Sequence, residues 1–321
     1  MEKVKELFEN KKELKFKDGK FKIMMMSDLH GGVGMSPQIS VAIDAMVESE
    51  KPDFVFFCGD TAGPGLIHVE NEKELRDMLD DFMTPLEKRN IPWAHVFGNH
   101  DDNHGINNEE QIEIYRSYPN CLSKRGDKNI HGVGNYIIPV MGENGEPELI
   151  LYFFDSKNRR IYLHYDQVMW YINSSEAIEK AYGRKIPSLM FMHIPMPELQ
   201  IIDDNREECK FMGTAAHHEP LPRVSSGLFN ACVQRGDVKG IFFGHDHYSD
   251  FIGELSGIRM GYDASMDYNA GQSDEMRGVR IFEVDEKDAA NFVTYMKRVK
   301  EVMGEKGNKV PFFAKEHNMW F

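Results

Sequence analysis

The sequence predicts an α/β fold with buried strands. Short apolar runs at 21–26, 53–58 and 92–97 are typical of strands that lie inside a protein. Segments with apolar residues at helical spacing, 37–50 and 70–89, separate these runs. This alternation of strand and helix indicates an α/β protein.

The rest of the chain continues the pattern. Residues 132–155 hold two strand-like runs around a turn at 142–146, which predicts a hairpin. Residues 196–222 contain three prolines and little periodicity, so we expect a long loop, a type of segment that is often functional. The other expected elements are helices at 109–117, 166–181 and 224–235, strands at 188–192 and 240–243, short strands within 251–284, and a last strand at 292–296.

Composition limits the class of protein. The 321 residues, 41% of them apolar, can form one large domain, expected over 20–300 between an N-terminal extension (1–19) and a C-terminal tail (301–321). The net charge of −14 argues against a broad nucleic-acid-binding surface, although divalent metals would reverse this sign locally for an anionic substrate. Four widely spaced cysteines, a charged N-terminus and no apolar run of about 20 residues predict a soluble cytoplasmic protein.

Polar side chains that can bind metal follow five of the expected strands. Functional sites in α/β sheets gather outside the carboxyl ends of the strands, so we expect these side chains to meet. The alternative is that they are turn-forming residues and structurally satisfied histidines. The candidate ligands are Asp28, His30, Asp60, Asn99, His193, His245 and His247, with His100 beside Asn99.

The types and number of these residues restrict the metal. Carboxylate, imidazole and amide ligands suit Mn, Fe, Zn, Ni or Co better than Ca or Mg alone, and the lack of cysteine argues against a structural zinc site. Seven ligands are too many for one ion. They suit two divalent or mixed-valence ions, roughly 3.5–4 Å apart, that share a carboxylate.

The motifs Asp28-Leu29-His30, Gly59-Asp60, Gly98-Asn99-His100-Asp101, His193 and Gly244-His245-Asp246-His247, in this order, resemble the calcineurin-like metallophosphoesterase family. The resemblance extends from about Phe21 to Phe282. It implies a four-layer αββα sandwich of two mixed β-sheets flanked by helices. Segments such as Phe191–Glu198 and Ser225–Phe229 resemble its purple-acid-phosphatase-like branch.

Two features depart from true purple acid phosphatases. Those enzymes have Asp-x-Gly where this chain has Asp28-Leu29-His30, and they place a tyrosine at the position of Gly63. Because that tyrosinate colours the purple ferric site, we expect a colourless site with His30 in its place.

The resemblance also implies roles for the residues. Asp28, His30, Asp60 and His247 would hold one ion. Asp60, Asn99, His193 and His245 would hold the other, with Asp60 bridging and Mn or Fe favoured. A metal-bridging hydroxide would attack a phosphomonoester in line, while His100, oriented by Asp101, assists the leaving group.

Several alternatives remain open. The same dinuclear site would serve a phosphodiesterase, and a non-catalytic metal-binding scaffold is a rival from another class. A nuclease is disfavoured by the acidic balance. We expect a small phosphorylated substrate and no membrane, and the oligomeric state is open. His104 and the cluster His217-His218-Glu219 lie in expected loops that could edge the site, and Asp246 is expected to anchor its loop.

Overall fold

The computed structural model describes residues 2–33, 37–63, 69–102, 105–156, 162–216, 219–268 and 275–308. Within these residues the strands form two mixed sheets. The first has the strand order β1 (Leu14–Lys15), β5 (Tyr136–Met141), β6 (Pro147–Phe154), β7 (Ser188–Met192), β8 (Val238–Phe243), β10 (Ile258–Tyr262), β9 (Ile252–Leu255). The second has the order β12 (Val293–Arg298), β11 (Gly278–Asp285), β2 (Lys20–Met26), β3 (Phe54–Cys58), β4 (Trp93–Val96).

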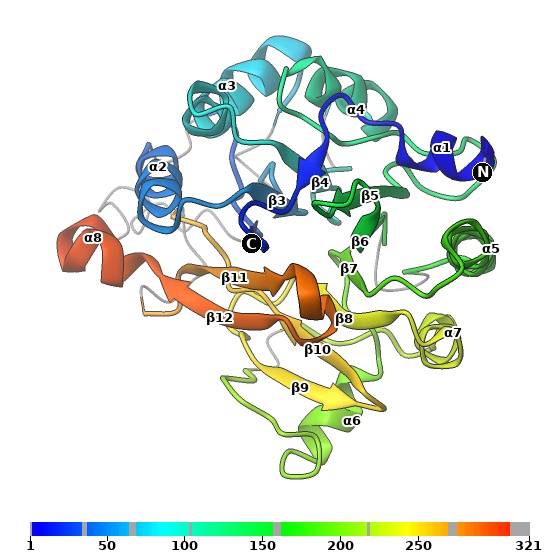
Figure 1. Ribbon diagram of the computed structural model, residues 1–321. Coiled ribbons are helices and arrows are strands. Elements are labelled where there is room, and N and C mark those ends of the chain that lie inside the picture. The colour runs from blue at the N-terminus through cyan, green and yellow to red at the C-terminus, as the bar shows by residue number, and fades with distance from the viewer. Residues whose placement is uncertain are drawn as a thin grey trace.

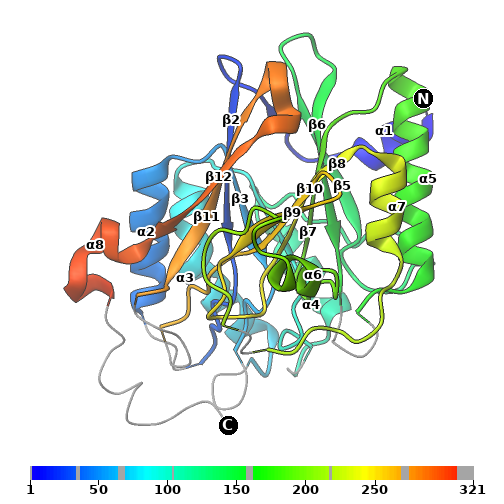
Figure 2. The same ribbon diagram turned by 90° about the horizontal axis from the view of Figure 1, so that it is seen from below.

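The sheets pack face to face, and helices cover their outer sides, so the molecule has four layers, as Figure 1 and Figure 2 show. This confirms the predicted αββα sandwich. On the five-stranded sheet lie α2 (Gln38–Glu50), α3 (Glu72–Lys88), α4 (Asn108–Ser117) and α8 (Val299–Asn308). On the seven-stranded sheet lie α1 (Glu2–Phe8), α5 (Tyr165–Tyr182), α6 (Leu199–Asp204) and α7 (Leu228–Arg235), and a 3₁₀ turn, η1 (Glu286–Asn291), joins β11 to β12.

Burial on both faces explains why the central strands are continuous apolar runs. In β3, Val55 and Phe57 belong to the core beneath the helices, whereas Phe54 and Phe56 belong to the core between the sheets. The ring centroid of Phe56 lies 4.8 Å from that of Phe153 in the opposite sheet. Every residue of β3 is therefore removed from water.

Parallel pairing brings the functional ends of the strands together. β2, β3 and β4 are parallel neighbours, as are β6, β7, β8 and β10. The carboxyl ends of the two sets are joined where Ser27, just after β2, forms a bridge with Ser265, just after β10. The loops of both sheets that follow these strands consequently share one edge of the sandwich.

Some elements were not expected from the sequence. The predicted loop 196–222 contains helix α6, whose six residues are too few for a helical period to be recognised. Near the N-terminus, α1 packs on α5 and β5, and β1 pairs with β5. The last helix, α8, packs against α2. Of the described helices, none is long and apolar enough to cross a membrane.

Candidate metal centre

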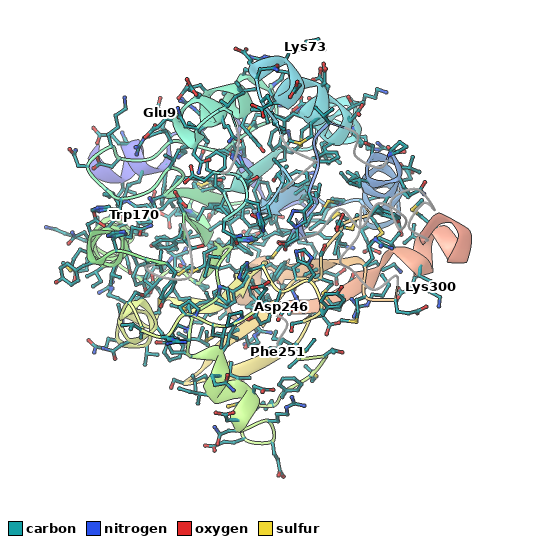
Figure 3. The ribbon with its side chains drawn as sticks, turned by 180° about the vertical axis from the view of Figure 1, so that it is seen from behind. Glu9, Lys73, Trp170, Asp246, Phe251 and Lys300 are labelled. Carbon is teal, nitrogen blue, oxygen red and sulfur yellow. The ribbon has the colours of Figure 1, made fainter. Side chains whose placement is uncertain are left out.

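Six of the predicted ligands form two groups at the shared edge of the sheets. Asp28, His30 and His247 make one group, and Asp60, His193 and His245 make the other. In each group, one ligand atom from each residue lies within 4.8 Å of the others. The residues lie within the first four positions after β2, β3, β7 and β8. Figure 3 locates this edge through Asp246, which lies between the two histidines of the loop after β8.

Unusual backbone conformations aim these side chains. Asp28, His30, Asp60 and His245 all have positive φ angles, between 48° and 77°. Non-glycine residues adopt this region at a cost, and such residues cluster at functional sites where the surrounding structure holds them. The strand-to-loop turns therefore direct ligands inward instead of continuing the strands.

Neighbouring groups orient the carboxylate of Asp28. Its Oδ2 accepts hydrogen bonds from the Ser27 hydroxyl and, at 3.0 Å, from the backbone N–H of His245. Its Oδ1 is buried and accepts no hydrogen bond from the described residues. Instead, Oδ1 lies 3.3 Å from His247 Nε2 and 3.9 Å from His30 Nε2. One oxygen is thus fixed by the protein and the other faces the imidazoles.

The second group is oriented in the same way. His193 donates from Nδ1 to the backbone carbonyl of Cys58 at 2.8 Å, which leaves Nε2 as the atom facing the site. That Nε2 lies 3.2 Å from Asp60 Oδ2. The other oxygen, Asp60 Oδ1, accepts the backbone N–H of His100 at 2.8 Å. Each group therefore directs one carboxylate oxygen and two imidazole nitrogens toward a position of its own.

Burial and neighbouring charges shift the pKa values of these residues. Burial alone would lower the pKa of His193, but the carboxylates of Asp60 and Asp28 raise it to about 10. Burial likewise opposes protonation of His247, yet the neighbouring Asp28 carboxylate raises its pKa to about 9. Burial lowers the pKa of His30 to about 3, which keeps this ring neutral. A divalent cation would have to displace the protons of His193 and His247, so its affinity depends on pH.

The donor set fits transition-metal ions. Ligand atoms that bind one ion at about 2.0–2.3 Å lie within about 4.6 Å of each other, and the two groups have this scale. The Nε2 atoms of His30 and His247 are 3.0 Å apart, as neighbouring ligands of one ion are. The buried, unbonded Asp28 Oδ1 is the acceptor that such an ion would satisfy.

The residues after β4 adjoin this centre. Asn99 and His100 are half-buried there, and the ring centroid of His100 lies 5.6 Å from that of His30. Asp101 does not hydrogen-bond the His100 ring, which differs from the expected orienting role. Its carboxylate accepts backbone N–H groups of Gly98 at 2.7 Å and Ala62 at 2.9 Å, so it connects the loops after β3 and β4.

Other predicted residues have separate outcomes. His104, His217 and His218 lie outside the described residues. Asp246 accepts the backbone N–H of Tyr248 at 3.0 Å, which fits its expected loop-anchoring role. Gly63, at the position of the purple-site tyrosine, donates its backbone N–H to the Gly31 carbonyl at 2.7 Å.

Two supporting serines were missed from the sequence. The Ser27 hydroxyl binds the Asp28 carboxylate, and the Ser265 hydroxyl donates to the Asp28 carbonyl at 2.9 Å. Ser27 stands next to a candidate ligand, which is a weak signal. Ser265 is 237 residues away from Asp28, and nothing local to it indicates this contact.

Comparison with known proteins agrees with this geometry. Among the relatives, an Arabidopsis thaliana protein named "Probable inactive purple acid phosphatase 14" is 32% identical over 317 residues, covering 85% of this chain and 77% of its own. The phosphatase DCR2 of Saccharomyces cerevisiae is 29% identical over 269 residues, which cover 73% of this chain and 45% of that protein.

Solved structures share the fold. A dimetal phosphatase from Danio rerio aligns with a TM-score of 0.53 at 13% identity, over 86% of this chain and 98% of that one. GAP50 of Plasmodium aligns with a TM-score of 0.56 at 11% identity, over 89% and 86% of the two chains. The family model described as calcineurin-like phosphoesterase matches residues 21–249, the part that carries every candidate ligand. With its sandwich and its paired ligand groups, the chain belongs to the calcineurin-like phosphoesterase family.

Proposed function

We propose that this protein is a metal-dependent phosphoesterase that hydrolyses small phosphorylated compounds with two metal ions. The observation that carries the proposal is the pair of adjacent ligand groups, Asp28, His30 and His247 beside Asp60, His193 and His245. When bound, two such ions supply a hydroxide nucleophile near neutral pH and stabilise negative charge on the phosphate oxygens. Mn and Fe are the favoured ions, and the cytoplasm is the proposed location.

The chain's own residues would have distinct tasks. Asp28 and Asp60 would offset the repulsion between two cations, with Asp60 proposed as a ligand of both ions and Asn99 as the remaining ligand of the second ion. His193 is fixed with Nε2 toward the site by its bond to the Cys58 carbonyl. His100, half-exposed next to His30, is placed to donate a proton or hydrogen bond to the leaving group.

A non-catalytic scaffold is the rival reading, because the names of three Arabidopsis relatives include the word "inactive". Two features support the enzyme. The ligand groups keep a complete set of carboxylates and imidazoles, and His100 lies beside them. A scaffold that had lost its function would not need to keep all of these buried polar groups, which are costly to bury.

The test is hydrolysis of p-nitrophenyl phosphate and bis-p-nitrophenyl phosphate by protein stripped with a chelator and refilled with Mn²⁺. The proposal predicts turnover that disappears on stripping and returns with metal. His247→Ala should abolish turnover, whereas the matched control His131→Asn, an exposed histidine bound to Asp166, should retain it. Two bound ions without turnover of either ester would favour the scaffold.

A further inference from the structure

A third carboxylate approaches the second ligand group. Glu219 Oε2 lies 3.8 Å from Nε2 of His245, a member of that group. Glu219 is not a member of that three-residue group, and its side chain is 28% exposed whereas that of His245 is 5% exposed. The carboxylate is therefore the more solvent-exposed partner of His245, at the border of the second ligand group.

The segment that carries Glu219 is bound along the loop of the metal-binding histidines. Contacts of residues 212–216 and of Glu219 with this loop region are as follows. They are the paired backbones of Met212 and Ile252 (2.8 and 2.9 Å), Thr214 N–H to Asp250 Oδ1 (2.7 Å), Ala216 N–H to Ser249 Oγ (3.0 Å) and Glu219 N–H to Asp246 Oδ2 (3.5 Å).

Asp250 anchors this arrangement to the rest of the fold. Arg298, at the end of β12, binds its carboxylate, and Arg280 of β11 donates to its backbone carbonyl at 2.7 Å. Asp250 is nearly buried, so these bonds are shielded from water. Glu219 is thus placed near His245 by its own backbone bond to Asp246, and residues 212–216 are tied to both sheets.

The charge at this position bears on the substrate. In the described part of the chain, the ion pairs of Asp28 and Asp60 are formed with histidines only. Two divalent ions with these two carboxylates would carry a net charge of about +2, or about +1 once a hydroxide is bound, and Glu219 would reduce either value by one. A phosphate group with two negative charges loses more attraction from this change than one with a single charge.

We propose that Glu219 makes the site select phosphate groups that carry one negative charge over those that carry two. This inference rests on the proposed function. The favoured substrates are phosphodiesters, or phosphomonoesters in their singly protonated form, which is populated below a second pKa of about 6. At slightly alkaline pH the diester alternative is then the preferred class.

The test measures binding, not turnover. Isothermal titration of Mn²⁺-loaded protein at about pH 8.5 compares inorganic phosphate, a dianion there, with diphenyl phosphate, a monoanion. Glu219→Gln should improve phosphate affinity about tenfold relative to diphenyl phosphate, the size expected for one charge at a partly screened distance of a few ångströms. Glu219→Asp, which keeps the charge, and Glu208→Gln, an exposed control in the same region, should keep the wild-type ratio.

The outcomes separate the two proposals. An unchanged ratio in Glu219→Gln overturns the selectivity role. A large loss of Mn²⁺ affinity in this variant, measured by chelator competition, also overturns it, because Glu219 would then be a ligand. If Glu219→Gln shows the expected change in phosphate affinity relative to diphenyl phosphate, but wild type hydrolyses neither ester, the proposed function is refuted and the selectivity role stands. Failure of wild type and variant to bind either anion contradicts both proposals.

Discussion

Gly98→Ala tests how closely the loop after β4 approaches the proposed bridging carboxylate. A Cβ at position 98 would lie 2.7 Å from Asp60 Cγ. Two carbons in contact keep about 3.5–4.0 Å, so Asp60 or the loop must move by about 1 Å. Catalytic groups have to stay within about 0.5 Å of their productive positions, and a displacement of about 1 Å can cost about 10²-fold. We therefore expect kcat/KM to fall about 10²-fold.

The assay is hydrolysis of the better of the two nitrophenyl esters at saturating Mn²⁺, with urea unfolding to check that the variant folds. Gly145→Ala is the control, because a Cβ in this turn between β5 and β6 meets nothing within 4 Å. It can cost stability through the positive φ of Gly145 but should keep wild-type kcat/KM. A folded Gly98→Ala protein within twofold of wild type would refute the packing argument.

Three further predictions concern single residues. His100→Asn should leave the metal content unchanged and slow turnover about 10²–10⁴-fold, as loss of a proton donor does; equal turnover would remove His100 from the mechanism. Asp101→Asn should leave a buried backbone N–H without an acceptor and cost about 1–3 kcal/mol of unfolding free energy, measured in urea. Burial lowers the pKa of His95 to about 3 in the folded protein, whereas this pKa is about 6.5 in the unfolded state. Between these two values the unfolded state binds more protons, so the contribution of His95 to stability decreases as the pH is lowered. Lowering the pH from 7 to 5 should therefore cost wild type about 2 kcal/mol more unfolding free energy than it costs His95→Phe. Urea unfolding of both proteins at both pH values measures this difference, in which the opposite contributions of His193 and His247 cancel.

The position of the candidate metal centre could be predicted from the sequence for a physical reason. A polar residue that directly follows a fully buried strand, as Asp60 follows β3, lies at the carboxyl end of that strand. Parallel strands bring such ends to one edge, so the order of motifs predicted which side chains meet. The assignment of ligands to two ions came from the family resemblance, and in the structure Asp28, His30 and His247 form one group and Asp60, His193 and His245 the other.

The sequence was not sufficient for contacts made between distant segments. Asp101 stands next to His100, which suggested an orienting bond to that ring, yet its carboxylate binds the backbones of Ala62 and Gly98. Glu219 lies near His245, and residues 212–216 lie along 249–252, contacts that no periodicity in the sequence indicates. Helix α6 has only six residues, and tertiary packing rather than local pattern defines it.

The central claim is that the two ligand groups hold two ions, and counting metal tests it most directly. Protein stripped by chelator, refilled with Mn²⁺ and passed through a desalting column would be analysed by inductively coupled plasma mass spectrometry. Wild type should hold about two Mn²⁺ per chain. His247→Ala should hold about one Mn²⁺ fewer, because this substitution removes a ligand of one group only. Less than one equivalent in the wild-type protein, after refilling with Mn, Fe or Zn, would contradict it.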